Sequence, residues 1–239
     1  MATGLGGGVL GGAALAAFGL GWPGVAIGAA NGALGGWRGT YAWRRPTGWL
    51  AFVLDSTWAS PLTAAALLTH AVAAVQPGRG GYLADLSRRA NRHVYGRGFR
   101  VRRGFLITIG NTVHGAGAIA TTDARRRRVV TDHEDVHVWQ GRWFGPSYPL
   151  LYGGWMLVGG ACGAVVWLVR GRRAPLAKVV ETCGYYLNPF EWWAYSRDAN
   201  WPPRSKVADV GWRRPIVRPL SETPRRISRA VPARPATPR

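Results

Sequence analysis

Residues 133–137 read HEDVH, a match to the pattern H-E-x-x-H, and their types and spacing are suited to metal chemistry. On an α-helix, His133 and His137 lie one turn apart on the same face, so both imidazoles can reach one zinc ion. Glu134 follows the first histidine and is placed to act as the general base that deprotonates a zinc-bound water. A surface helix with two ordinary polar histidines is the alternative interpretation.

The residues around this motif favour a helix. Apolar and aromatic side chains share one face with both histidines across 129–144, because they recur at spacings of three and four. We expect the helix to begin near Asp123 or Ala124 and to end at Gly145-Pro146.

With these residues the chain resembles the zincin metallopeptidases. The resemblance is carried by HEDVH, by the VWQ after it and by the FGPSY behind, and it is strongest over 105–152 and 188–198. It implies a small antiparallel sheet ahead of the active-site helix. It also implies that an edge strand, 105–109 or 116–121, pairs with an extended peptide substrate.

A zinc ion held by two histidines needs a third protein ligand. In zincins whose third ligand is a glutamate, that residue lies on a later helix, and Glu191 matches it by resemblance. Asn188 and Pro189 suit the start of such a helix, as cap and first residue. Glu181, on the apolar segment 175–184, is the competing ligand.

Further site residues are expected around this glutamate. By the same resemblance, Asp198 is a candidate to orient a zinc-bound histidine, although it lies further along the chain than in the best-known pattern. Tyr195 is a candidate to hydrogen-bond a developing oxyanion, as are Tyr185 and Tyr186. Aromatic packing accounts for all three tyrosines equally well.

The composition indicates an anionic partner. The 239 residues carry a net charge of +20, from 31 basic and 11 acidic residues, together with 13 tryptophans. Because tryptophan and arginine are enriched at membrane interfaces, we expect anionic lipid headgroups rather than nucleic acid. Abundant arginine, alanine and glycine suggest a GC-rich bacterial coding sequence.

Residues 4–36 are uncharged and rich in glycine and alanine. Glycines recur every fourth residue over 4–12 and again over 24–36, a glycine zipper that lets two helix backbones approach closely in lipid. Trp22-Pro23-Gly24 is a turn signal. We therefore predict a membrane hairpin of two short helices, which also offers a surface for homo-oligomerisation; a flexible linker is the alternative.

Two further apolar stretches are long enough to span a bilayer. The first, 48–75, contains Asp55, Pro61 and His70, so it is either a span or a broken helix, with functional or interfacial ionisable groups. The second, 148–169, is uncharged. A single crossing there would separate Glu191 from the histidines, so we expect a re-entrant or partly buried segment, with the arginine-rich segments facing the cytoplasm.

These patterns predict an α+β fold, mainly α, with membrane-associated helices. We expect a membrane region over 1–76, a zincin-like domain over 77–201 with 148–169 as an insertion, and a disordered Arg/Pro-rich tail over 202–239. Within the domain, 82–95 is predicted to be an amphipathic basic helix. Strands alternate over 99–109 around a turn at 103–104, and His114 is expected in a surface loop.

The functional expectation is a zinc metallopeptidase at the bacterial cytoplasmic membrane, with a peptide or protein as substrate. The alternative is a non-enzymatic membrane protein whose hairpin drives oligomerisation and whose metal site is structural. A nucleic-acid-associated protein is a third possibility, which the apolar stretches disfavour.

Overall fold

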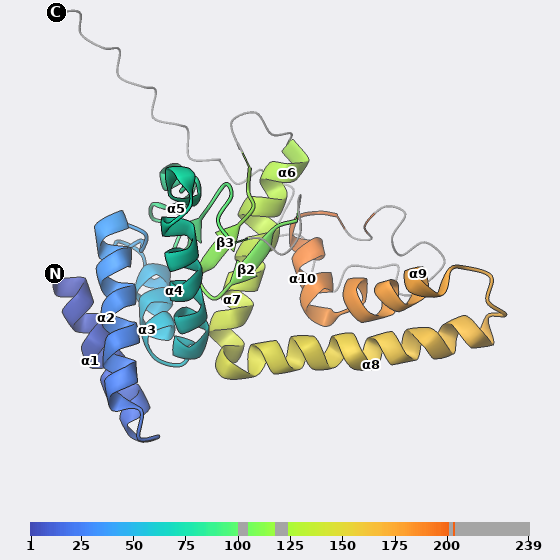
Figure 1. Cartoon of the computed structure of the whole chain (residues 1–239), viewed down its shortest axis with the longest axis horizontal. Coiled ribbons are helices and arrows are strands. Elements are labelled where there is room, and N and C mark those ends of the chain that lie inside the picture. The colour runs from blue at the N-terminus through green and yellow to red at the C-terminus, as the bar shows by residue number, and fades with distance from the viewer. Residues whose placement is uncertain (100–104, 118–123, 201–202, 204–239) are drawn as a thin grey trace, which may run out of the picture.

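Helices make up most of the computed structural model, which describes residues 1–99, 105–117, 124–200 and 203. A three-stranded mixed sheet lies among them (Figure 1). The prediction of a mainly helical α+β fold is confirmed. The tail from 204 onwards lies outside the described residues.

The glycine-rich N-terminus forms a hairpin of α1 (Ala2–Ala16) and α2 (Gly21–Arg38). The two backbones are so close that a Cβ added at Gly7 would lie 2.1 Å from the carbonyl oxygen of Gly28. The predicted hairpin is therefore present, but it turns at 17–20. Pro23 lies in the first turn of α2, where its missing N–H costs nothing.

The apolar stretch that follows is a broken helix, one of the two predicted forms. It consists of α3 (Pro46–Ser56) and α4 (Ser60–Ala74), which meet at an angle of 88°. Each helix has a proline in its first two positions, which suits a helix start.

The predicted helix over 82–95 is wrong. Only α5 (Ala84–Ser87) is helical, because Arg89 and Asn91 adopt positive φ angles of 56° and 59° and turn the chain. β1 (His93–Val94) follows and pairs in parallel with β3 (Thr112–His114).

β2 (Ile107–Ile109), within the predicted strand 105–109, pairs antiparallel with β3 around a turn at Gly110-Asn111, and this partner strand was not predicted. The sheet order is β1-β3-β2. The expected turn at 103–104 and residues 118–121 of the expected third strand lie outside the described residues. His114 is not in a surface loop: it belongs to β3 and is fully buried.

Valines fix this sheet against the helix that carries HEDVH. Val94 and Val113 of the sheet pack in one buried cluster with Val130 and Val138 of that helix. The sheet thus lies directly against the motif.

The HEDVH helix is part of a long helical run that begins at Ala124, as predicted. Along it follow α6 (Ala124–Arg128), the π-helical turn η3 (Val129–His133), α7 (Glu134–Phe144), the short turn η4 (Gly145–Ser147) and α8 (Tyr148–Val169). Figure 1 shows α8 leaving α7 at a sharp corner. Among the described residues, this run is the one helix that is by itself long and apolar enough to cross a membrane.

The chain reverses after α8 rather than within it. Of the two forms expected for 148–169, the re-entrant one is not formed, because α8 is one uninterrupted helix of 22 residues, and α8 is partly buried instead, at Gly159 and Gly163. A return leg of α9 (Leu176–Glu181), the π turn η5 (Thr182–Tyr186) and α10 (Pro189–Arg197) then runs back along it. This leg brings α10 beside α7 (Figure 1).

A buried ion pair fixes α7 to the N-terminal helices. Arg142 Nε and Nη2 each lie 2.8 Å from an oxygen of Asp55, and both side chains are 2% exposed. Tyr41 donates a hydrogen bond to the same carboxylate at 2.9 Å, and Asn111 donates another at 3.2 Å. Asp55 is therefore a core residue that joins α3, α7 and the β2–β3 turn.

Breaking this pair should destabilise the whole fold. We expect Arg142→Met to lower the free energy of unfolding by about 3–5 kcal/mol, because the carboxylate of Asp55 stays buried without its cation. Denaturant unfolding in detergent micelles measures the loss. Arg173→Met, in the exposed turn after α8, is the control and should change stability by less than about 0.5 kcal/mol. Equal stability of the two variants would contradict a structural role for the pair.

Candidate metal centre

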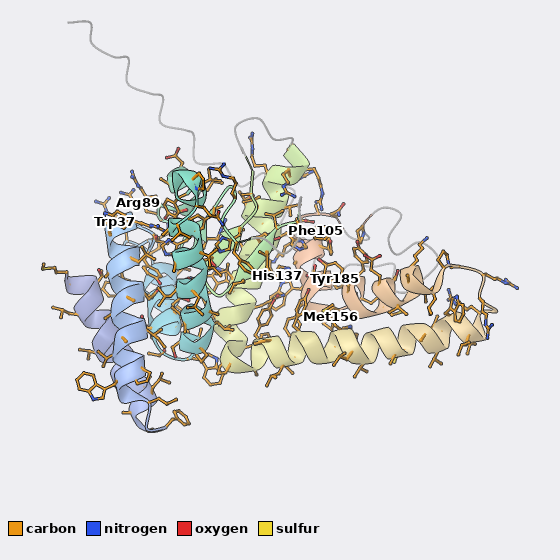
Figure 2. All side chains as sticks on the ribbon, viewed as in Figure 1. Trp37, Arg89, Phe105, His137, Met156 and Tyr185 are labelled. Carbon is orange, nitrogen blue, oxygen red and sulfur yellow. The ribbon has the colours of Figure 1, made fainter. Side chains whose placement is uncertain are left out.

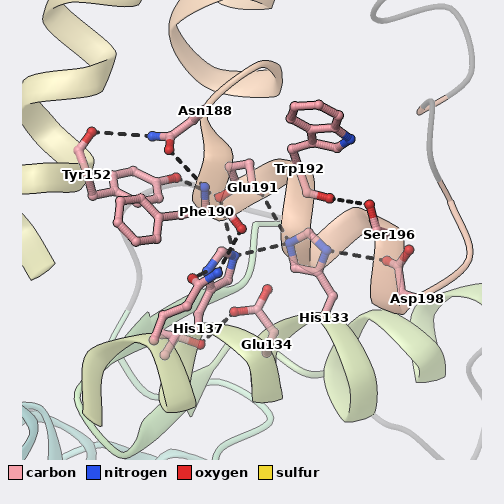
Figure 3. A network of polar contacts seen from close by, with 12 residues as sticks. His133, Glu134, His137, Tyr152, Asn188, Phe190, Glu191, Trp192, Ser196 and Asp198 are labelled. Carbon is pink, nitrogen blue, oxygen red and sulfur yellow. Dashed lines mark hydrogen bonds and ion pairs between the residues drawn. The ribbon is translucent and has the colours of Figure 1, made fainter. Parts of the chain in front are cut away.

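Three predicted ligands meet between α7 and α10 (Figure 3). Glu191 Oε2 lies 3.4 Å from His133 Nε2, and Glu191 Oε1 lies 3.3 Å from His137 Nε2. The two Nε2 atoms are 3.2 Å apart. All three side chains are buried and their donor atoms lie within 4.8 Å of one another, so the group can hold a metal ion.

Local structure explains why these residues converge. The π turn η3 ends at His133 and α7 continues from it, which stacks His137 one turn further on. Asn188 caps α10 by accepting a hydrogen bond from Phe190 N at 3.1 Å, so Glu191 falls in the first turn of the helix. The competing residue Glu181 is exposed on α9 and is not in this group.

The group fits a cation by its chemistry. Glu191 Oε2 is buried and faces His133 Nε2 at 3.4 Å, but this contact lacks hydrogen-bond geometry and no other described residue donates a hydrogen bond to the oxygen. A buried carboxylate oxygen without a donor is costly unless a cation compensates it. Two imidazole nitrogens facing that carboxylate complete a donor set that suits a divalent transition-metal ion.

Asp198 lies beside His133, where an orienting carboxylate was predicted. Its Oδ2 is 3.4 Å from His133 Nδ1 and 3.1 Å from Nη1 of Arg125. Tyr195 packs its ring edge-on against the imidazole of His133 at a centroid distance of 4.5 Å. These contacts constrain the ring from two sides.

Gln140 contacts Nδ1 of His137, as Asp198 contacts Nδ1 of His133. Gln140 was not predicted as a site residue. It is fully buried; its Oε1 lies 2.9 Å from His137 Nδ1, and its Nε2 donates to the carbonyl of Phe190 at 3.0 Å. Because Oε1 is an acceptor, the proton of His137 is held on Nδ1 and the Nε2 lone pair is left for a metal. The signal was present in the sequence: Gln140 lies three residues after His137 on the same face.

Two further polar contacts come from residues that were not predicted as site residues. One lies in α8, which was predicted only as an apolar segment, and the other lies in β2, which was predicted only as a strand. Tyr152, in the first turns of α8, donates to Glu191 Oε1 at 2.6 Å. Thr108 of β2 donates to Glu134 Oε2 at 2.6 Å. Figure 3 shows Glu134 on the same side of α7 as the two histidines.

The predicted oxyanion tyrosines pack in an aromatic cluster beside the ligand group, and their role towards an oxyanion stays a prediction. The rings of Tyr185 and Tyr186 are 5.0 Å apart, and Tyr186 lies 6.0 Å from Tyr195. Aromatic packing, the alternative interpretation, describes these contacts.

The acid–base balance of the group favours a protonated imidazole. Burial lowers the pKa of His133, but the facing carboxylates of Asp198 and Glu191, each 3.4 Å away, outweigh it and raise the pKa to about 10. Burial also opposes the charge of Glu191, yet the two imidazoles hold the pKa of its carboxyl far below the usual range. The metal-free group therefore retains a proton at neutral pH.

No protein-family model, curated protein or solved structure matches this chain. The function therefore has to be argued from the site and its chemistry. The resemblance to zincins stays a prediction from the sequence, carried by HEDVH, VWQ and FGPSY.

Metal binding should release a proton. His133 is protonated in the metal-free protein below a pKa of about 10, whereas a metal ligand must be a neutral imidazole. We expect at least one proton to be released per ion at neutral pH, because the pKa of His137 is raised as well, so that apparent affinity rises with pH until the pKa of His133 is passed. Calorimetric titration with Zn²⁺ in buffers of different ionisation enthalpy measures this number. Binding without proton release would contradict the assigned protonation.

Replacing Gln140 should weaken metal binding without abolishing it. We expect Gln140→Leu to raise the dissociation constant for Zn²⁺ by about 10–100-fold, because His137 loses the acceptor that orients it. Gln76→Leu is the matched control: Gln76 also donates to a backbone carbonyl, that of Gly98 at 3.0 Å, away from the site. Unchanged affinity of Gln140→Leu would contradict the positioning role.

Proposed function

We propose that this chain is a membrane-associated, zinc-dependent metallopeptidase-like hydrolase. The observation that carries the proposal is the buried group of His133, His137 and Glu191, with Glu134 next to it on α7. Two histidines and a glutamate, with a fourth position left for water, are the ligand set of hydrolytic zinc enzymes. When bound, zinc lowers the pKa of a water and polarises a carbonyl oxygen.

The protein's own acid–base group in this proposal is Glu134. Its carboxylate takes the proton of the attacking water and delivers it to the leaving amine nitrogen. Thr108 Oγ1 donates to Glu134 Oε2 and so fixes the orientation of the carboxylate. The side chain is 6% exposed, and this burial keeps bulk water from competing for the proton.

Two tyrosines of α8 contact the ligands and are further candidates, beside Tyr195, to stabilise negative charge on a carbonyl oxygen. Tyr148 OH lies 3.2 Å from His137 Nδ1, and Tyr152 OH lies 2.6 Å from Glu191 Oε1. Phenolic donors at the edge of the ligand group can turn towards a developing oxyanion.

The substrate in this proposal is an extended peptide. Among the described strands, β2 lies at one edge of the sheet, and its Thr108 contacts Glu134. A peptide that paired with β2 would pass close to the ligand group, in agreement with the zincin resemblance.

A second candidate function is a non-enzymatic membrane protein with a structural metal. The burial of all three ligands supports it, because structural metal sites are closed to solvent. The tight approach of α1 and α2 uses their glycines within one chain, so oligomerisation would have to use other surfaces of this hairpin.

Glu134→Gln distinguishes the two functions. We expect peptide hydrolysis to fall by about 10²–10⁴-fold, because the general base is lost, while one zinc ion per chain is retained. Hydrolysis of a quenched fluorescent peptide library and the zinc content of the purified protein are the measurements.

Glu181→Gln is the matched control, since Glu181 is exposed on α9 and should leave hydrolysis unchanged. Equal turnover of the two variants would remove Glu134 from the mechanism. Zinc binding with no hydrolysis by the wild-type chain would favour the structural alternative.

A further inference from the structure

One face of α8 is apolar and uncovered along its whole length. Figure 2 shows its side chains projecting away from the rest of the molecule. We call this the outer face of α8; it comprises Leu150, Leu157, Val158, Val165 and Leu168, each of which is more than half exposed. A continuous apolar strip of this kind is rare on a protein surface in water.

The opposite face of α8 is covered by the return leg. A Cβ added at Gly159 would lie 2.6 Å from the carbonyl oxygen of Cys183, and one at Gly163 would lie 3.0 Å from the Cys183 side chain. Tyr152 lies on the same side and reaches Glu191. The two faces of α8 therefore differ, since one meets protein and the other meets nothing in the described chain.

The return leg argues against α8 crossing a bilayer. α8 is about 33 Å long at 1.5 Å per residue, enough to span. However, Lys178 and Glu181 are exposed on α9, which packs alongside α8. A crossing would carry both charges into the hydrocarbon, which is strongly unfavourable.

Other exposed apolar groups lie at the same end of the molecule as α8. Figure 1 shows the α1–α2 turn and the α7–α8 corner at the bottom of the view with α8. That turn exposes Phe18 and the adjoining Trp22, while Trp58, half exposed, donates to the carbonyl of Trp143 just before the corner. The four-arginine helix α6 lies at the top, away from α8.

We infer that α8 lies flat in one leaflet of an anionic phospholipid bilayer, with its outer face among the acyl chains and its return leg on the aqueous side. Arg170, Arg172 and Arg173, at the end of α8, are exposed and can reach the phosphates. Tyr148 and Tyr152 in its first turns contact the ligand group, so the metal centre is held just above the headgroups. Its substrates are then peptide segments at the membrane surface.

This inference rests on the membrane association in the proposed function and holds whether or not the centre hydrolyses peptides. It is tested with the full chain in vesicles of phosphatidylcholine and phosphatidylglycerol. Cys162 is an exposed native thiol on α8, and Cys183→Ala leaves it as the sole cysteine. Leu150→Cys, Leu157→Cys and Leu168→Cys, each with both native cysteines replaced by alanine, supply further positions for a fluorescent probe.

Quenching by lipids brominated at known acyl-chain depths should give one common, shallow depth for probes at 150, 157 and 168. A crossing helix would instead place 157 deeper than both ends, and that profile would overturn the inference. Probes shielded from every lipid quencher would also overturn it, because a second copy of the chain would then cover the face. Zinc content equal to that of the wild type shows that each variant is folded.

A sidedness measurement provides a second check. Cysteines placed at 128, in α6, and at 172, beyond α8, should react equally with a membrane-impermeant thiol reagent added outside the vesicles. Opposite accessibility would overturn the flat arrangement. A common shallow depth combined with inactive protein would leave this inference standing while the hydrolase proposal fails.

Discussion

A carboxylate buried between two imidazoles is the constraint on which the rest of this structure depends. Glu191 is 3% exposed and its charge requires a proton or a metal ion shared with His133 and His137. It is separated from them by the whole of α8, so the chain must leave α7, reverse and return. Gly159 and Gly163 make this return possible, because their lack of a side chain lets the return leg lie against α8.

A second buried charge pair holds the other side of α7. Asp55 and Arg142 join that helix to α3, while Tyr41 and Asn111 satisfy the remaining carboxylate lone pairs. The HEDVH helix is therefore clamped by polar contacts on opposite sides, with valines of the sheet packed between them. This rigidity suits a ligand group, because metal ligands must be positioned before the ion arrives.

Sequence reasoning found the ligand group because its signals are local. HEDVH fixes two histidines by helical spacing, and the Asn188-Pro189 start puts Glu191 at the beginning of a helix. It failed where the outcome depends on partners distant in sequence. β1 is too short for periodicity, and it exists because β3 pairs with it. Burial of His114 likewise depends on Thr69 of α4, whose Oγ1 lies 2.9 Å from its Nε2.

The apolar stretch at α8 shows why hydropathy alone does not distinguish a span from a surface helix. Its sequence is apolar on all sides, which normally indicates a helix surrounded by lipid. Here one side is apolar because the glycines and Met156 face η5, and the other because Leu150 and Leu157 face outwards. Two different apolar environments thus produce one uncharged segment, and the return leg with its exposed Lys178 distinguishes them. Because α8 lies flat in one leaflet, the metal centre at the α7–α8 corner is held at the membrane surface.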